Sequence, residues 1–312
     1  MITASTRSLG LLIVALLVGC APSPAQHSGA RSNAGPTAHA DSKASPSARA
    51  AGEGAARTAG QPKAQTLDEL LLFFPTKFPD GNWQPDGLLF EDAWFDAADG
   101  TRLHGWYCPC ENSRAVILYA HGNAGNLAHR SARMRYFQKE LRVAALIFDY
   151  RGYGRSEGTP TVEGVLQDAR AARRLLAGRA RVNESQVVLL GDSLGGAVAV
   201  QLAGEDGARG LVLESTFSSL RDIASHHYPR LAWLVPADKL DSVSQIARYN
   251  GPLLQSHGDA DRTIPYALGW RLFEAAKGVK QFVRMPGRDH NDRLPADYLR
   301  QLDRFIEALP ER

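Results

Sequence analysis

The sequence has few cysteines and no apolar run long enough to cross a membrane, and each shortage excludes a class of protein. Three cysteines in 312 residues are too few for a scaffold held together by disulfides. Cys108 and Cys110 do not complete a tetrahedral metal site, because no matching pair of histidines or cysteines follows them, so we expect no bound metal. The apolar run at residues 9–18 is about half as long as the roughly 20 residues that a transmembrane helix needs.

The sequence also lacks a large charge excess. The chain has 36 Lys and Arg against 33 Asp and Glu, a net charge of +3. Six of the basic residues but only two of the acidic ones lie within residues 1–66, so the rest of the chain is close to neutral. Nucleic-acid binding needs a clustered basic face, and we therefore expect no nucleic-acid partner.

The N-terminus predicts a bacterial lipoprotein signal. Arg7 precedes the apolar run at residues 9–18, and residues 17–20 then read Leu-Val-Gly-Cys, which resembles a lipobox. In this interpretation residues 1–20 are the signal peptide, and Cys20 receives the lipid and becomes the mature N-terminus. The alternative is a simple signal peptide that is cut at a nearby small residue.

The residues after Cys20 indicate in which bacterial membrane the lipoprotein is expected. Ala21 and Pro22 follow it, whereas lipoproteins of this class that stay at the inner membrane usually have an Asp there. A lipid anchor with more than one acyl chain holds a protein firmly on a membrane. We therefore expect the protein in the bacterial cell envelope, lipid-anchored on the outer membrane and facing the periplasm.

Residues 21–66 predict a disordered tether. They contain 14 Ala, 6 Ser, 5 Gly and 5 Pro, and no Leu, Ile, Val, Met, Phe, Tyr or Trp. Such a segment cannot bury enough apolar surface to offset the entropy cost of ordering it. The folded domain is expected to occupy residues 67–312.

Within the folded domain, short apolar runs alternate with stretches of helical periodicity. Strands are predicted at residues 115–120, 144–149, 186–190, 210–213, 253–256 and 281–285, and helices at 128–139, 162–176, 194–204, 266–276 and 296–308. Strands that are apolar on both faces fit a parallel sheet covered by helices. We expect one α/β domain with a doubly wound, mostly parallel sheet, and an antiparallel hairpin at residues 91–95 and 103–108 on its edge.

A serine motif lies between one predicted strand and the next helix. Residues 191–195 read Gly-Asp-Ser-Leu-Gly, and a serine on such a tight turn has its hydroxyl exposed above the sheet. The alternative is a glycine-rich turn that binds phosphate, which would normally bring the Lys-Ser/Thr of a P-loop. No such lysine is present, so Ser193 is predicted to be a nucleophile.

Two further motifs accompany the serine in a fixed order. Residues 121–126 read His-Gly-Asn-Ala-Gly-Asn after one predicted strand, and residues 149–154 read Asp-Tyr-Arg-Gly-Tyr-Gly after the next. With these motifs, the chain resembles the α/β-hydrolase superfamily over nearly the whole folded domain. The resemblance is to the branch of serine aminopeptidase-like hydrolases and protein depalmitoylases that has this form of the first loop.

The resemblance implies an α/β-hydrolase fold without a cofactor and assigns roles to particular residues. Ser193 would attack an acyl carbon, and the backbone N–H groups of Asn123 and Leu194 would form the oxyanion hole. The base would be His290, which follows the last strand, although Arg288 and Asp289 stand where the family usually has Gly-Gly or Ala-Gly.

The acid that orients the histidine has three candidates. In the family, the loop after the penultimate strand reads Gly-x-x-Asp, with Ile or Val three residues later and then Pro. Residues 258–265 fit this pattern when Asp261 is the acid, and the chain order of nucleophile, acid and base then matches the fold. Asp259 is expected to be a turn residue, and Glu214 is a weaker third candidate.

Residues 218–250 interrupt the rhythm of strands with an apolar segment. This insertion predicts a small cap over the site that shapes an acyl or hydrophobic pocket, with Thr216 and Phe217 lining it. The alternative is that these side chains belong to the packing of an ordinary surface helix.

These features predict a lipid-anchored serine hydrolase. Its substrate would be a small-molecule or lipid-like ester, thioester or related acyl compound, cleaved through an acyl-enzyme intermediate. A serine peptidase acting on small peptides is an alternative, because the triad does not choose the leaving group. A catalytically silent hydrolase-fold protein that binds a partner in the envelope is another.

The lipoprotein interpretation predicts that Cys20→Ser in the full-length protein abolishes membrane anchoring but leaves the folded domain active. The tether has no large apolar residues and so contributes nothing to a core. Fractionation into membrane and soluble material, with an activity assay on each, checks this. Retention of the variant in the membrane pellet, once uncleaved precursor is excluded, would count against lipidation at Cys20.

Overall fold

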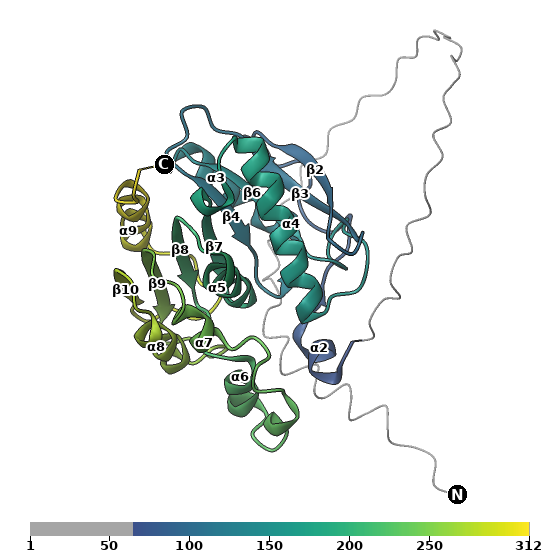
Figure 1. Cartoon of the computed structure of the whole chain (residues 1–312), viewed down its shortest axis with the longest axis vertical. Helices are drawn as coiled ribbons and strands as arrows, with labels where there is room; N and C mark the ends of the chain where they lie inside the picture. Colours follow the sequence, from purple (N-terminus) through teal and green to yellow (C-terminus); the bar gives the residue numbers. More distant parts are fainter. Residues whose placement is uncertain (1–64, 312) are drawn as a thin grey trace, which may run out of the picture. The chain divides into compact units, whose positions relative to one another are not determined.

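The computed structural model describes residues 65–311 of the chain. The predicted signal peptide, the lipidation site Cys20 and the tether up to residue 64 lie outside the described residues. Within residues 65–311, no helix combines the length and apolar character needed to span a bilayer. Figure 1 shows the described part as a central sheet with helices packed against it.

The sheet has eight strands in the order β10-β9-β8-β7-β4-β6-β3-β2. The strands are β2 (Glu91–Asp96), β3 (Arg102–Cys108), β4 (Val116–Ala120), β6 (Ala144–Asp149), β7 (Val188–Asp192), β8 (Gly210–Glu214), β9 (Leu253–Gly258) and β10 (Lys280–Met285). All neighbours are parallel except β2 with β3 and β3 with β6. The expected doubly wound, mostly parallel sheet with an antiparallel hairpin at one edge is confirmed.

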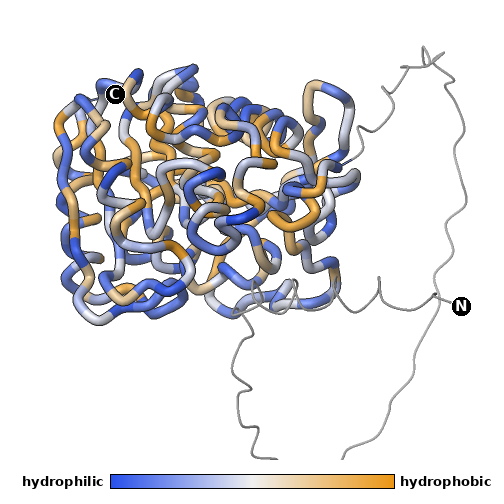
Figure 2. Tube along the Cα trace, turned by 90° about the horizontal axis from the view of Figure 1, so that it is seen from below, coloured by the Kyte–Doolittle hydropathy of each residue, from blue (hydrophilic) through white to orange (hydrophobic). Residues whose placement is uncertain are grey.

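Burial explains why the central strands are apolar throughout. Every residue of β4, β6 and β8 is buried, as expected of parallel strands covered on both faces. In the edge strand β2, by contrast, Ala93 and Phe95 are buried whereas Trp94 is exposed. In Figure 2 the hydrophobic stretches run through the interior of the described part, and hydrophilic stretches predominate along its outline.

Helices cover both faces of the sheet. The apolar side chains of α4 (Val162–Ala180), α5 (Leu194–Asp206) and α8 (Tyr266–Ala275) join one core cluster on the first face. Those of α3 (Ser131–Lys139) and α9 (Ala296–Glu307) join a second cluster on the opposite face. The predicted helix at residues 128–139 is divided into the 3-10 helix η1 (Leu127–Arg130) and α3.

The segment at residues 218–250, predicted to be a cap, lies between β8 and β9. It contains α6 (Leu220–His227), the 3-10 helix η3 (Ala232–Leu234) and α7 (Ser242–Ile246). In Figure 1, α6 lies at the end of the described part away from α9. A further 3-10 helix, η2 (Glu184–Gln186), leads into β7.

The first part of the folded domain contains elements that the sequence did not predict. Three unpredicted elements are α2 (Leu67–Leu72), β1 (Phe74–Pro75) and β5 (Ala124–Gly125), and β1 pairs with β5 in parallel. Gln65 and Thr66, which we expected in the tether, contact the fold. The Gln65 side chain donates to the Pro160 carbonyl oxygen at 2.6 Å, and Thr66 N–H donates to the Glu69 carboxylate at 3.0 Å.

The parallel strands fix where a site can form. The carboxyl ends of β4, β7, β8, β9 and β10 meet at one edge of the sheet, and ligands of open α/β folds bind outside that edge. The residues predicted to be functional follow these same strand ends.

Candidate active site

Ser193 lies on a tight turn between β7 and α5. Its backbone has φ 53° and ψ −120°, a conformation that costs a non-glycine residue about 1–3 kcal/mol and persists only where its surroundings enforce it. A Cβ on Gly191 would lie 2.1 Å from the Gly195 carbonyl oxygen, and a Cβ on Gly195 would lie 1.9 Å from that of Ala120. Both glycines of the motif are therefore steric requirements of the turn.

Three hydrogen bonds hold this turn. Ser193 N–H donates to the Glu214 carbonyl oxygen at 2.9 Å, and the Ser193 carbonyl oxygen accepts from Gly196 N–H at 3.0 Å and from Thr216 Oγ1 at 2.8 Å. Thr216 is fully buried and Phe217 is 3% exposed within the core. Their contact with substrate stays a prediction, whereas Thr216 has a defined contact with the backbone of the serine turn.

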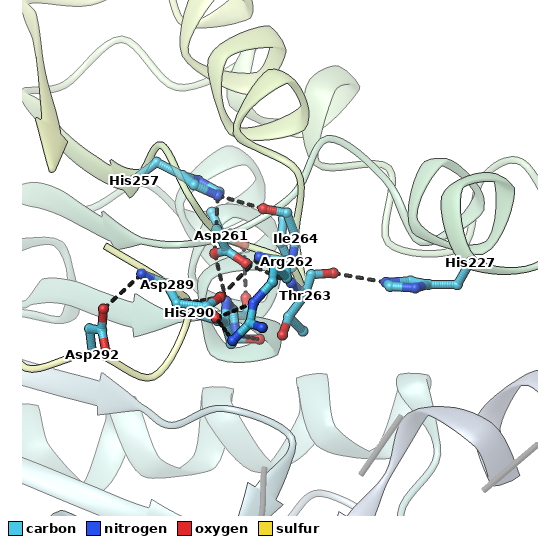
Figure 3. A network of polar contacts seen from close by, with 11 residues as sticks. His227, His257, Asp261, Arg262, Thr263, Ile264, Asp289, His290 and Asp292 are labelled. Carbon is cyan, nitrogen blue, oxygen red and sulfur yellow. Dashed lines mark hydrogen bonds and ion pairs between the residues drawn. The ribbon is translucent and has the colours of Figure 1, made fainter. Parts of the chain in front are cut away.

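The structure brings Ser193, His290 and Asp261 together from three separate loops. His290 Nε2 lies 3.1 Å from Ser193 Oγ, and His290 Nδ1 lies 2.8 Å from Asp261 Oδ2. Figure 3 shows the side chains of Asp261 and His290 meeting at the ends of their two loops. In this chain of hydrogen bonds His290 can accept the serine proton through Nε2 while Nδ1–H donates to the carboxylate.

Asp261 is held in its charged form. Its Oδ1 atom accepts from Thr263 N–H at 2.9 Å and from Ile264 N–H at 2.7 Å. Burial by itself raises the pKa of this carboxyl, but hydrogen bonds from His257, His290 and the backbone outweigh burial and lower the pKa well below its usual value. Asp261 therefore stays a carboxylate at neutral pH, where it can orient His290 and stabilise a positive charge on it.

His257 is a residue of this network to which the sequence analysis gave no role. It is fully buried, and its Nε2 atom lies 2.9 Å from the Ile264 carbonyl oxygen and 3.3 Å from Asp261 Oδ2. Both neighbours accept hydrogen bonds, so we assign the ring proton to Nε2. In Figure 3, Asp261 lies between the rings of His257 and His290. The signal in the sequence was the position of His257 at the end of a strand, four residues before Asp261.

Asp259 lies in a different network. It accepts from Arg284 Nε at 2.8 Å and from Gly287 N–H at 2.6 Å, which ties the end of β9 to the turn after β10. The role of a turn residue for Asp259 stays a prediction.

Glu214 is also engaged away from the histidine. Its buried carboxylate accepts from Tyr298 OH at 2.5 Å and forms an ion pair with Arg133. Among the three candidate acids, the geometry thus favours Asp261 as the partner of His290.

Asp289, which departs from the family pattern, connects two loops of the site. One is the loop after β9 that contains Asp261, here called the acid loop, and the other is the loop after β10 that contains His290, here called the base loop. Its Oδ1 atom accepts from Arg262 N–H at 2.9 Å and from His290 N–H at 2.8 Å, and its Oδ2 atom accepts from Arg262 Nε at 2.6 Å. These hydrogen bonds, the one from Arg262 N–H foremost, lower the pKa of Asp289. Asp289 therefore forms an ion pair with Arg262 and also holds the backbone N–H of His290 (Figure 3).

The loop at residues 121–126, here called the oxyanion loop, lies against the serine. A Cβ on Gly122 would be 3.5 Å from Ser193 Cβ, and Asn123 follows Gly122 directly. Leu194 is the first residue of α5, where backbone N–H groups have no partner within the helix. The assignment of Asn123 and Leu194 N–H as oxyanion donors stays a prediction.

A buried pair lies beneath the oxyanion loop. Asp149 Oδ1 accepts from Leu127 N–H at 2.8 Å and lies 3.7 Å from His121 Nε2. Burial raises the pKa of Asp149 to about 7 and lowers the pKa of His121 to about 4. His121 is therefore neutral at pH 7 and supports the loop without adding charge to it.

The cysteines of the folded domain are both free. Cys108 is buried, and burial raises the pKa of its thiol to about 12, so it is not a reactive thiolate. Within residues 65–311, no group of three or more His, Cys, Asp or Glu residues is arranged to hold a metal ion.

Comparison with known proteins identifies similar sequences. The family described as serine aminopeptidase, S33, matches residues 111–237. The chain is 36% identical over 247 residues to the uncharacterized protein Rv2307c of Mycobacterium tuberculosis, covering 77% of this chain and 86% of that protein. It is 34% identical over 226 residues to the alpha/beta hydrolase domain-containing protein WAV2 of Arabidopsis thaliana, covering 66% of this chain and 73% of that protein.

Solved structures share the fold. The esterase Pf2001 of Pyrococcus furiosus superposes with a TM-score of 0.64 over 76% of this chain and 98% of its own. The two sequences are 19% identical, so this similarity establishes the fold and not the substrate.

The two aspartates on the acid loop provide a matched test of the site. Asp261→Asn should lower kcat for a p-nitrophenyl ester by about 10⁴-fold, because the neutral amide cannot hold His290 in the tautomer that accepts the serine proton. Asp259→Asn should remain within about tenfold of the unmodified protein, because its carboxylate contacts the β10 turn. A reversed pattern would transfer the role to Asp259, and two mild effects would point to Glu214.

Proposed function

The chain belongs to the α/β-hydrolase superfamily, and we propose that it cleaves a carboxylic ester, thioester or related acyl bond. The observation that carries this proposal is the uninterrupted hydrogen-bond chain from Ser193 through His290 to Asp261. A nucleophile, a base within reach of it and an acid that orients the base are the three groups that acyl transfer by serine needs.

The first half of the reaction forms an acyl-enzyme. His290 Nε2 takes the proton from Ser193 Oγ as the oxygen attacks the acyl carbon, and the carbonyl oxygen becomes an oxyanion. The N–H groups of Asn123 and Leu194 stabilise that charge. The tetrahedral intermediate then expels the alcohol or thiol, which leaves with the proton held by His290, and the acyl group remains on Ser193 as an ester.

The second half releases the acid. His290 Nε2 removes a proton from water, the resulting oxygen nucleophile attacks the acyl carbon, and the same two N–H groups hold the oxyanion again. Collapse of this intermediate breaks the bond to Ser193 Oγ, which regains its proton from His290. In both halves Asp261 remains a carboxylate and stabilises the imidazolium, in keeping with its lowered pKa.

We place esters and thioesters first among the substrates. The segment at residues 218–250 exposes the apolar side chains of Leu231, Trp233 and Leu234. His227 joins this segment to the loop of Asp261 through the Thr263 carbonyl oxygen at 2.8 Å. Cleavage of small peptides is the second candidate, since the matching family is described as a serine aminopeptidase. The two differ in the leaving group, which would be an amine in a peptidase.

We also propose that the protein acts at the bacterial envelope, attached to the membrane through lipid on Cys20. This part of the proposal comes from the sequence of residues 1–66. A lipid-like acyl substrate in or near the membrane would then be accessible to the folded domain.

The proposal predicts that Ser193→Ala and His290→Ala each reduce p-nitrophenyl ester hydrolysis to near background, a loss on the order of 10⁶-fold in kcat for triad enzymes. Ser185→Ala, an exposed serine in η2, is the matched control and should hydrolyse the ester at the original rate. Circular dichroism and thermal melts establish that each variant is folded. Activity near the original level in either triad variant would refute the assignment.

A further inference from the structure

The first segment of the folded domain lies along the oxyanion loop. We call residues 67–76, which comprise α2, Phe73, β1 and Thr76, the N-terminal strap. Its strand β1 pairs in parallel with β5 of the oxyanion loop. Phe74 N–H donates to the Asn123 carbonyl oxygen at 3.1 Å, and Thr76 N–H donates to the Gly125 carbonyl oxygen at 3.0 Å.

Asn123 is joined to the N-terminal strap through its side chain as well as through its backbone. Its side-chain amide donates to the Leu72 carbonyl oxygen at 2.9 Å, across 51 positions of sequence. Its carbonyl oxygen accepts from Phe74 N–H at 3.1 Å and from Tyr153 OH at 2.7 Å. The side chain and the carbonyl group of Asn123 are therefore both held in place. Because the bond angles at Cα are fixed, the backbone amide nitrogen of Asn123 has little freedom to move.

The strap is itself fixed at its other end. Glu69 is buried and accepts from Val162 N–H at 3.0 Å, which binds α2 to the start of α4. Lys239 Nζ, from the cap segment, lies 3.2 Å from Glu69 Oε1 and 2.7 Å from Asp68 Oδ2. Phe73, between α2 and β1, is 5% exposed and belongs to the main core cluster.

From these contacts we propose that the N-terminal strap is a positioning element of the oxyanion hole, in which the Leu72 carbonyl sets the amide nitrogen of Asn123 through the Asn123 side chain. The inference rests on the proposed function, because it needs Asn123 N–H to act on the oxyanion.

The expected size of the effect follows from the sensitivity of such donors to geometry. Loss of one oxyanion donor costs about 10²–10³ in kcat, and a displacement of about 1 Å can cost about 10²-fold. A strap that only stabilised the fold would change the fraction of folded protein and leave the turnover of each folded molecule unchanged.

The test is Asn123→Ala in the full-length protein. The backbone N–H is retained, but the hydrogen bond to Leu72 is lost. Functional sites are counted by titration with a fluorophosphonate, so that unfolded protein does not enter the rate. We expect kcat per titrated site to fall about 10- to 100-fold while KM changes less than about threefold. Affinity for a trifluoromethyl ketone, whose adduct carries an oxyanion, should fall by the same factor as kcat/KM.

A variant in the strap links the effect to the strap itself. Glu69→Ala removes the hydrogen bonds from Val162 N–H and Thr66 N–H and one contact of Lys239, and none of these partners lies in the oxyanion loop. Glu69→Ala should also lower kcat per titrated site. This decrease should be smaller when Glu69→Ala is added to Asn123→Ala, because both substitutions act through the hydrogen bond between Asn123 and Leu72. Purely additive effects of the two substitutions on kcat would contradict the coupling.

Gln138→Ala is the matched control. The Gln138 amide donates to the carbonyl oxygens of Leu89 and Pro109, each at 2.8 Å, outside the oxyanion loop. This variant should lose thermal stability and keep its kcat per site. The proposal is overturned if Asn123→Ala behaves in the same way. Absence of fluorophosphonate labelling at Ser193 in the unmodified protein would instead refute the proposed function, and the strap proposal with it.

Discussion

The backbone of Ser193, at positive φ, is the constraint on which the site depends. A residue in that conformation needs about 1–3 kcal/mol of support, and the support comes from the backbone of β8, the Thr216 hydroxyl and two glycines without which the turn would collide with itself. The turn fixes Oγ at the carboxyl edge of the sheet. The loops after β4, β9 and β10 then need only short excursions to bring the oxyanion loop, Asp261 and His290 to it.

Those loops are also tied to one another. Asp289 binds Arg262 and the backbone of His290, so the acid and base loops are held as one unit. His227 Nε2, on α6, lies 2.8 Å from the Thr263 carbonyl oxygen, which connects the cap segment to the acid loop (Figure 3). Thr263 N–H in turn donates to Asp261. A shift of the cap segment would therefore change the position of the Asp261 carboxylate, which orients His290.

The sequence predicted those features of the fold and the site that produce a local pattern of residues. Strands buried on both faces appear as apolar runs, and the order of the motifs indicated Ser193, Asp261 and His290. His290 lies within hydrogen-bonding distance of both Ser193 and Asp261. The β1–β5 pair had no such pattern, and the position of His257 four residues before Asp261 does not by itself indicate a contact between their side chains. Two-residue strands have no periodicity, and a hydrogen bond between Asn123 and Leu72 joins residues that only the finished fold brings together. Asp289 was noticed as a departure, but its partner Arg262 could not be read from the sequence.

The central claim is that Ser193 is a nucleophile activated by His290. Peptide mapping after reaction with a fluorophosphonate at neutral pH tests it most directly, because the probe forms a stable bond only with an activated serine. The account predicts one adduct per chain, on the peptide that contains Ser193, and labelling that slows by orders of magnitude in His290→Ala. An adduct on another serine, or equally fast labelling without His290, would contradict it.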